Sequence, residues 1–216
     1  MMLSSRTTIT AITSDHCFII SILKESCGAL FIFMVYNVKN RMGGLHMEFE
    51  TLIRQRYSCK NYTDRKVDEE TLQKILEAGR LAPTAKNLQE QMIYVLESEK
   101  ALTAFDSVCP CRYGAPTVLV AAYDENNVFT YPGNQVKSGM EDVSIVAAHM
   151  ILAAADAGVD SCWLNYFDPE KMAQALGLPA NLKVVMAMDL GYASEKGKPL
   201  QNHAKRKDLK ETVRRI

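Results

Sequence analysis

The chain has 216 residues, 48% of them hydrophobic, and its 25 basic residues balance its 25 acidic ones. This length and apolar content predict one globular domain with a substantial core rather than a disordered chain. Because the charges balance, no overall field attracts nucleic acid or an anionic membrane, and binding must depend on local clusters. The six cysteines lack the dense, regular spacing of a disulfide scaffold, which favours a reducing, cytoplasmic setting.

Residues 1–46 differ in composition from the rest of the chain. Their apolar patch from Cys27 to Tyr36 is shorter than the ~20 residues of a membrane-spanning helix, and Arg6 alone gives too little early charge for a signal peptide. The residues just before Met47 can be encoded by a purine-rich message of the kind that binds a bacterial ribosome. We therefore expect residues 1–46 to be an extension without function, either translated leader or disordered, and residues 47–216 to form the functional domain.

A cationic segment follows a short amphipathic run that begins at Phe49. It reads Arg56, Tyr57, Ser58, Cys59 and Lys60, and so places two long cations and a hydroxyl group within five residues. Arginine and lysine donate charge-assisted hydrogen bonds, and the serine adds a neutral donor and acceptor. This first cluster, which extends to Tyr62, is suited to hold an anionic ligand that accepts many hydrogen bonds.

A second polar cluster lies at the end of the next predicted helix. Asp68 is placed to cap that helix, its apolar residues recur at helical spacing, and Pro83 ends it. The cluster, Pro83 to Gln89, then offers the hydroxyl group of Thr84 and the side-chain amides of Asn87 and Gln89. These groups can reach a polar heterocycle.

The middle of the chain alternates between strands and helices. Residues 92–96 predict a strand, residues 100–105 the start of a helix, and residues 117–123 a buried central strand. Cys109 and Cys111 lie between the last two, but no second pair or nearby histidine completes a tetrahedral set, so we expect no metal. A turn-rich loop at residues 131–134 is placed to cover a substrate.

The last third predicts two more helices and two more strands. Residues 140–157 form a helix that is apolar on nearly all sides and is expected to be buried nearly all round, ended by Gly158. A strand at 161–165 precedes a helix capped by Asp168, and residues 183–190 form the last strand. The tail after Lys196 is basic. Because no glycine-rich phosphate-binding motif is present, side-chain cations must hold any phosphate group.

The two clusters together resemble the nitroreductase family. In that family an Arg-x-Ser-x-Arg/Lys element and a Pro-Ser-x-x-Asn-x-Gln element bind FMN, and seven residues fall on those positions: Arg56, Ser58, Lys60, Pro83, Thr84, Asn87 and Gln89. The chain departs from the family at Ala85, where a second hydroxyl group is common, and at Glu90-Gln91, where Pro-Trp is common.

The resemblance implies an α+β, three-layer α/β/α fold with a mixed central sheet, and a homodimer with flavin at the interface. It implies that Trp163, Leu164 and Asn165 run along the flavin ring, largely through their backbone, and that Lys205 and Arg206 return to the FMN phosphate. Lys60 is expected to stabilise the reduced flavin, without any covalent catalytic residue. The implied FMN-binding set is Arg56, Tyr57, Ser58, Lys60, Pro83, Thr84, Ala85, Asn87, Gln89, Trp163, Leu164, Asn165, Lys205 and Arg206.

We therefore expect an FMN-dependent oxidoreductase that transfers hydride from NAD(P)H to a nitroaromatic, quinone or similar acceptor by a ping-pong mechanism. Alternatives are other chemistry on the same scaffold, such as flavin reduction or reductive dehalogenation, and a non-catalytic, flavin-binding redox sensor that uses cysteines such as Cys59. The sequence leaves the acceptor and the choice between NADH and NADPH open.

Overall fold

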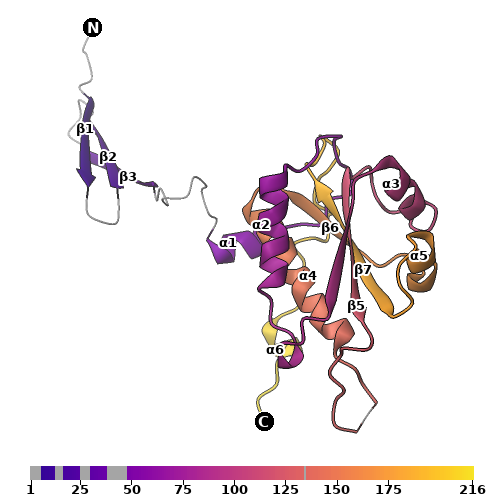
Figure 1. Ribbon diagram of the computed structural model, residues 1–216. Coiled ribbons are helices and arrows are strands. Elements are labelled where there is room, and N and C mark those ends of the chain that lie inside the picture. The colour runs from indigo at the N-terminus through magenta and orange to yellow at the C-terminus, as the bar shows by residue number, and fades with distance from the viewer. Residues whose placement is uncertain (1–5, 13–16, 25–29, 38–47, 134) are drawn as a thin grey trace. The chain divides into compact units, whose positions relative to one another are not determined.

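The computed structural model describes residues 6–12, 17–24, 30–37, 48–133 and 135–216, in two compact units, Met1–Met47 and Glu48–Ile216 (Figure 1). In the first unit, β1 (Arg6–Ile12), β2 (Cys17–Lys24) and β3 (Leu30–Asn37) pair antiparallel with β2 in the middle. The start that the sequence suggests at Met47 lies outside the described residues.

The second unit is built on a four-stranded sheet in the order β4 (Gln91–Leu96), β5 (Thr117–Asp124), β7 (Leu182–Gly191) and β6 (Asp160–Leu164). All three neighbouring strand pairs are antiparallel, so the expected mixed sheet is wrong for these strands. The reason is that β5 and β6 share a direction but β7 inserts between them. The only parallel pairing in the described part of the chain is one bridge, between Ser58 and Ser161.

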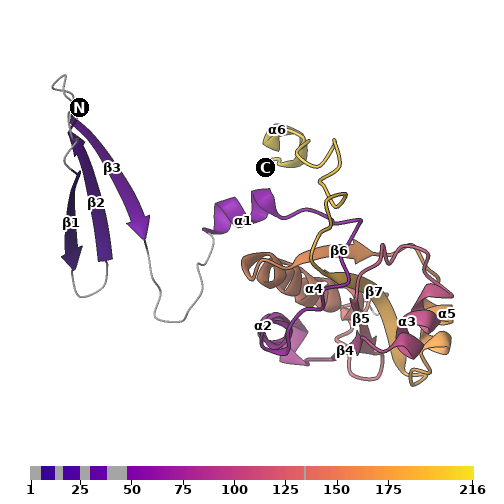
Figure 2. The same cartoon turned by 90° about the horizontal axis from the view of Figure 1, so that it is seen from above.

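Helices cover both faces of this sheet and make the three expected layers (Figures 1 and 2). The long helices α2 (Glu69–Arg80) and α4 (Gly139–Asp156) pack on one face, where Leu119, Met186 and Met188 lie in the same core cluster. The shorter helices α3 (Glu99–Asp106) and α5 (Pro169–Ala175) pack on the other face through Phe105 and Met172. Within the described residues, no helix has the length and apolar character needed to cross a membrane.

The helix ends follow the signals in the sequence. Asp68 accepts a hydrogen bond from the Thr71 backbone N–H at 2.9 Å, and Asp168 caps α5 through the backbone N–H groups of Glu170 and Lys171. Gly158 follows α4 with a positive φ of 71°, a conformation that favours glycine. These three predicted boundaries are confirmed.

One face of α4 is exposed, which corrects the expectation that this helix is buried nearly all round. Met140 is 64% exposed and Ile145 38%, and Ala148 and His149 are exposed beside them. The opposite face packs on α2 so closely that a Cβ at Gly79 would lie 2.8 Å from the Met150 side chain. A single chain therefore covers only one side of an apolar helix. Apolar residues are also exposed on or beside α1 (Phe49–Gln55) and α6 (Leu209–Thr212), namely Phe49, Ile53, Leu209 and Val213.

Candidate functional site

The first cluster lies along the outer edge of β6. Ser58 forms the parallel bridge with Ser161, and the Cys59 backbone N–H donates to the Ser161 carbonyl oxygen at 2.9 Å. The chain after α1 thus adds a short extended segment to the sheet. Backbone pairing fixes the positions of Ser58 and Cys59 beside Ser161, on the strand that leads into Trp163–Asn165, which the resemblance assigns to the same site.

The C-terminal segment returns to this cluster. The Tyr57 hydroxyl group donates to the Gly197 carbonyl oxygen at 2.7 Å, and the rings of Tyr57 and His203 meet edge to face with centroids 6.3 Å apart. His203 Nε2 also lies 3.4 Å from the Arg54 carbonyl oxygen. Figure 2 shows the C-terminal chain crossing the segment that follows α1. The C-terminal segment, which continues to Lys205 and Arg206, therefore contacts the chain on both sides of Arg56, at Arg54 and at Tyr57.

The crossing is close enough to require glycine at position 197. A Cβ there would collide with the Asn61 carbonyl oxygen and crowd Ala193. The same carbonyl accepts the Ser194 backbone N–H at 3.1 Å, and the Ser194 hydroxyl group bonds to the Asn61 side chain. The docking of the C-terminal segment is thus fixed by backbone contacts as well as by Tyr57 and His203.

The cations of this region have no acidic partner in the part of the chain from residue 48 onward that the structure describes. Across residues 48–133 and 135–216, no carboxylate forms an ion pair with Arg56, Lys60, Lys205 or Arg206. The Lys60 ammonium lies 5.6 Å from the centre of the Tyr113 ring, and Arg206 Nη1 donates to the Lys205 carbonyl oxygen at 2.7 Å. Unpaired cations on two segments that contact each other suit an anionic group such as a phosphate.

The end of β6 offers backbone rather than free side chains. Leu164 is buried in the core, the Trp163 indole N–H donates to the Asn165 side-chain oxygen, and the Asn165 amide donates to the Val185 carbonyl oxygen at 2.9 Å. These side chains are therefore engaged within the protein. This arrangement is compatible with the expectation that a flat ligand meets this segment mainly through its backbone.

The second cluster is a loop that satisfies most of its own polar groups. The Thr84 hydroxyl group accepts from the Gln89 backbone N–H at 3.0 Å, and the Gln89 amide donates to the Asn87 carbonyl oxygen at 3.3 Å. Lys86, Asn87 and Gln89 have positive φ values of 52°, 55° and 53°, which are uncommon for residues other than glycine. Such strain persists only where the surroundings hold it, and it is concentrated at functional sites.

The two clusters are not joined within one chain. The second cluster is held by α4, since the Ala85 backbone N–H donates to the Asp142 carboxylate at 2.9 Å, and by the loop after β5, since Asn127 donates to the Leu88 carbonyl oxygen. No hydrogen bond or ion pair among the described residues links it to the first cluster or to the C-terminal segment. Contacts within one chain therefore link the first cluster to β6 and to the C-terminal segment, whereas the second cluster is not linked to any of these among the described residues.

Three carboxyl groups are buried that the sequence analysis did not expect to be buried. Asp189 is fully buried on β7, and neither of its side-chain oxygens has a hydrogen-bond partner among the described groups. Burial raises the pKa of Asp189 to about 9, although the positive charge of Arg112 acts in the opposite direction. Glu90 and Asp142 are the other two. The burial of Asp189 could have been predicted, because it is the one acidic residue in the apolar strand sequence Met186-Ala187-Met188-Asp189-Leu190.

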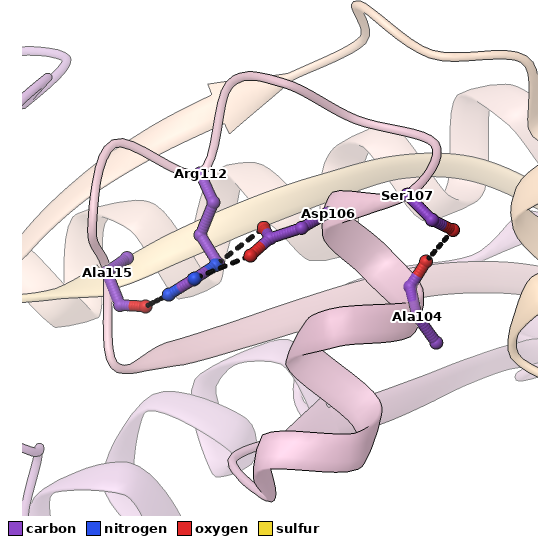
Figure 3. Close-up of polar contacts among 5 residues, drawn as sticks. All are labelled: Ala104, Asp106, Ser107, Arg112 and Ala115. Atoms are coloured by element: carbon purple, nitrogen blue, oxygen red, sulfur yellow. Dashed lines mark hydrogen bonds and ion pairs between the residues drawn. The ribbon is translucent and has the colours of Figure 1, made fainter.

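Figure 3 shows how the loop that carries Cys109 and Cys111 is held. Arg112 donates two hydrogen bonds to the Asp106 carboxylate, at 2.7 and 2.6 Å, and a third to the Ala115 carbonyl oxygen at 2.8 Å. Burial raises the pKa of the Cys59 and Cys109 thiol groups, and raises that of Cys162 to about 11. These three thiols are therefore protonated at neutral pH, unlike the exposed thiolates of oxidant sensors.

Comparison with known proteins places this site in context. The model of the nitroreductase family matches residues 53–111 and 109–192. A nitroreductase family protein of Clostridium difficile 630 is 35% identical, with a TM-score of 0.73 over 78% of this chain and 98% of that one. An FMN-dependent nitroreductase of Clostridium difficile R20291 is 26% identical, with a TM-score of 0.58 over 70% and 91%. A protein of Archaeoglobus fulgidus, provisionally named an NADH dehydrogenase/NAD(P)H nitroreductase, is 29% identical over 67% of this chain and 84% of its own.

Proposed function

The chain belongs to the nitroreductase family, and we propose on that premise that it is an FMN-dependent oxidoreductase. In this proposal it takes hydride from NAD(P)H and passes it to a nitroaromatic, quinone or similar acceptor in a ping-pong reaction. The names of the relatives support the choice of FMN and of a nicotinamide donor. Hydride transfer itself is chemistry that a bound flavin supplies.

The observation that carries the proposal is the return of the C-terminal segment to the first cluster. The segment contacts Tyr57 through Gly197 and His203, and neither Arg56 nor the nearby Lys205 and Arg206 of this segment has a carboxylate partner in the described chain. We assign Arg56, Lys205 and Arg206 to the FMN phosphate, because guanidinium and ammonium groups bind phosphate through charge-assisted hydrogen bonds.

The remaining residues would hold the flavin ring. Ser58 pairs with Ser161 on β6, the strand that leads into Trp163–Asn165, and in this proposal Ser58 and the backbone of Trp163–Asn165 would line one edge of the ring. Lys60 would place a positive charge beside the pyrimidine end of the flavin and so favour negative charge there. Pro83, Thr84, Ala85, Asn87 and Gln89 would contact the ring from the second cluster.

The separation of the two clusters supports a homodimer with flavin between subunits. The exposed face of α4 and the exposed residues Phe49, Ile53, Leu209 and Val213 give the chain apolar surface that a second copy can cover. Across such an interface, the second cluster of one subunit would complete the site formed by the first cluster of its partner. We expect light scattering to give the mass of a dimer, and a monomer that binds FMN as tightly would refute the shared site.

We further propose that residues 47–216 carry this function in the cytoplasm. Free cysteines at 59, 109, 111 and 162 support a reducing setting, and every residue assigned above lies in the unit Glu48–Ile216. A protein that starts at Met47 should therefore dimerise and bind FMN as well as the full chain. If it is insoluble or free of flavin while the full chain is yellow, residues 1–46 are required.

Two measurements test the activity. The purified protein should show the absorbance of oxidised flavin, and adding NADH or NADPH should bleach it until a nitroaromatic or quinone is supplied. Parallel lines in double-reciprocal plots would establish the ping-pong order. Bound flavin without steady-state NAD(P)H oxidation would instead indicate a redox sensor, a role that the buried, protonated thiols do not favour.

A further inference from the structure

Two buried carboxyl groups close the loop of the second cluster. Asp142, in the first turn of α4, accepts the Ala85 backbone N–H at the start of the loop, at 2.9 Å. Glu90 directly follows Gln89 at the end of the loop, and its carbonyl oxygen accepts the Asp124 backbone N–H at 2.9 Å. Each of the two residues is only 4% exposed. Together they fasten both ends of the strained segment Ala85–Gln89.

One oxygen of each carboxyl group lacks a donor. Glu90 Oε2 and Asp142 Oδ2 are buried, and no N–H or O–H group of the described residues donates to them. The Ser138 hydroxyl group approaches the other Glu90 oxygen at 3.4 Å, a long hydrogen bond. Ser138 is the N-cap of α4 and its carbonyl oxygen accepts the Asp142 backbone N–H at 2.9 Å, so both carboxyl groups lie at the first turn of this helix. A single proton between them satisfies both orphan oxygens, whereas two charged carboxylates would leave both unsatisfied.

We propose that Glu90 and Asp142 share one proton and act as a positioning pair that fixes the loop Pro83–Gln89 in the conformation that binds flavin. This inference rests on the proposed function for its ligand but not for its geometry. Neither residue touches the flavin in this arrangement. They act through the backbone of Ala85 and Gln89.

The described residues around the pair supply no counter-charge. Neither carboxyl group has a cation among its hydrogen-bond or ion-pair partners in the described chain. The nearby ionisable groups have other contacts or point to solvent. On α4 and the loop before it, Glu141 bonds to Tyr131 and Lys137 is exposed. At the end of β5, Asp124 accepts a hydrogen bond from Asn181, and Tyr123 packs on Gly139. Lys86 in the second cluster lies over the Phe129 ring, and Arg80 at the end of α2 pairs with Glu77.

The protonation state is set by this environment. Burial, and then hydrogen bonding to Asp142, raises the pKa of Glu90 to about 7. Below that pH the shared proton is present and the loop is closed. As the pH rises through 7 the proton is lost, two buried negative charges repel, and Asp142 and Glu90 no longer hold Ala85 and Gln89 in place.

FMN binding across neutral pH tests the positioning role. The affinity of the wild-type protein for FMN should fall by about tenfold or more as the pH rises from about 5.5 to 8.5. The reason is that repulsion between the two carboxylates breaks the hydrogen bond from the Ala85 backbone N–H to Asp142. Glu90→Gln should remove this dependence and keep the tight binding of low pH, because its amide replaces the shared proton as a donor to Asp142. Asp142→Asn should do the same from the other side. The control Glu99→Gln changes an exposed acid in the first turn of α3 and should behave as wild type.

Unfolding by urea provides a readout that needs no flavin. A carboxyl pKa raised from 4.5 to about 7 by folding gives stability that is complete below pH 4.5, is lost progressively up to about pH 7 and changes no further above it. Followed by the fluorescence of Trp163, Glu90→Gln should make the slope between pH 4.5 and 7 shallower and keep the slope that buried Asp189 contributes up to about pH 9. The proposal is overturned if neither amide variant is shallower than the wild type between pH 4.5 and 7, or if FMN affinity is independent of pH. Loss of FMN binding at every pH, with the slope intact, would refute the proposed function instead.

Discussion

The first and second clusters are assembled in different ways. The first is brought together from distant parts of the sequence, because Ser58 bridges to β6 and Tyr57 contacts Gly197 and His203. The second is local, a seven-residue loop whose hydrogen bonds run mostly between its own members, with α4 and the loop after β5 holding it from outside.

This difference indicates different roles for the two clusters. The cations of the first cluster have no carboxylate partner in the described chain, so their charge is available to a ligand. In the second cluster the polar groups of Thr84 and Gln89 form hydrogen bonds within the loop and so stabilise its shape. Substitutions in the first region should therefore discriminate between ligands of different charge. Substitutions in the second should weaken all flavins alike.

The largest effect is expected where the C-terminal segment crosses Asn61. Gly197→Val puts side-chain atoms against the Asn61 carbonyl oxygen and should displace the segment, together with Lys205 and Arg206. Loss of two charge-assisted contacts, each about 1.5 to 3 kcal/mol, predicts FMN binding weaker by about a hundredfold or more. Fluorescence titration measures this. Gly177→Ala is the control, because it strains a positive φ of 65° but meets no atom within 4 Å, so it should lower stability and leave FMN affinity unchanged. If Gly197→Val leaves the FMN affinity unchanged, the C-terminal segment does not contribute to the FMN site.

A smaller and more selective loss is expected from a single cation. Arg206→Ala should weaken FMN by about tenfold to a hundredfold and riboflavin far less, because the proposed contact is to the phosphate that riboflavin lacks. Isothermal titration with both ligands gives the ratio. Lys210→Ala is the matched control, since Lys210 already pairs with Asp208 at 3.3 Å. Equal losses for FMN and riboflavin would place Arg206 away from the phosphate.

The sequence predicted the elements of the second unit because their signals are local. Caps at Asp68 and Asp168, the stop at Gly158 and the apolar strands all depend on neighbours within a few residues, and all are confirmed. The strand directions are not encoded in this way. The insertion of β7 between β5 and β6 depends on the path of the chain, and for that reason the mixed sheet was wrong.

A candidate site could be proposed from the sequence where it follows a motif, but not where it depends on contacts between distant residues. The residues of both clusters could be proposed from their types and spacing. No sequence pattern predicts that the Tyr57 ring contacts His203. Nor does one predict that Glu90 and Asp142, 52 positions apart, lie close together. The burial of α4 was misjudged because its apolar residues surround the helix, whereas one chain covers only one side.

Lys60 tests whether the first cluster also acts on the flavin ring. Its ammonium lies over the Tyr113 ring and forms no ion pair with a carboxylate of residues 48–133 or 135–216, so its charge is available. Lys60→Gln should lower the flavin reduction potential by about 30 mV, which corresponds to a tenfold change in a two-electron equilibrium, and should slow reduction by NAD(P)H. Lys60→Arg keeps the charge and should largely preserve both. Titration against a reference dye reads the potential, and an unchanged value in Lys60→Gln would leave Lys60 as a surface cation.

The smallest effect should come from the loop itself. Thr84→Val keeps the shape of the side chain but removes the hydroxyl oxygen that accepts the Gln89 backbone N–H at 3.0 Å. One hydrogen bond of about 1 kcal/mol predicts a several-fold loss of affinity, because part of the binding energy must then order the loop. The loss should be the same for FMN and riboflavin, since no charge is removed. Thr103→Val, on the exposed side of α3, is the control and should change neither. A loss confined to FMN would mean that Thr84 acts on the phosphate, and the division of work between the two clusters would then be wrong.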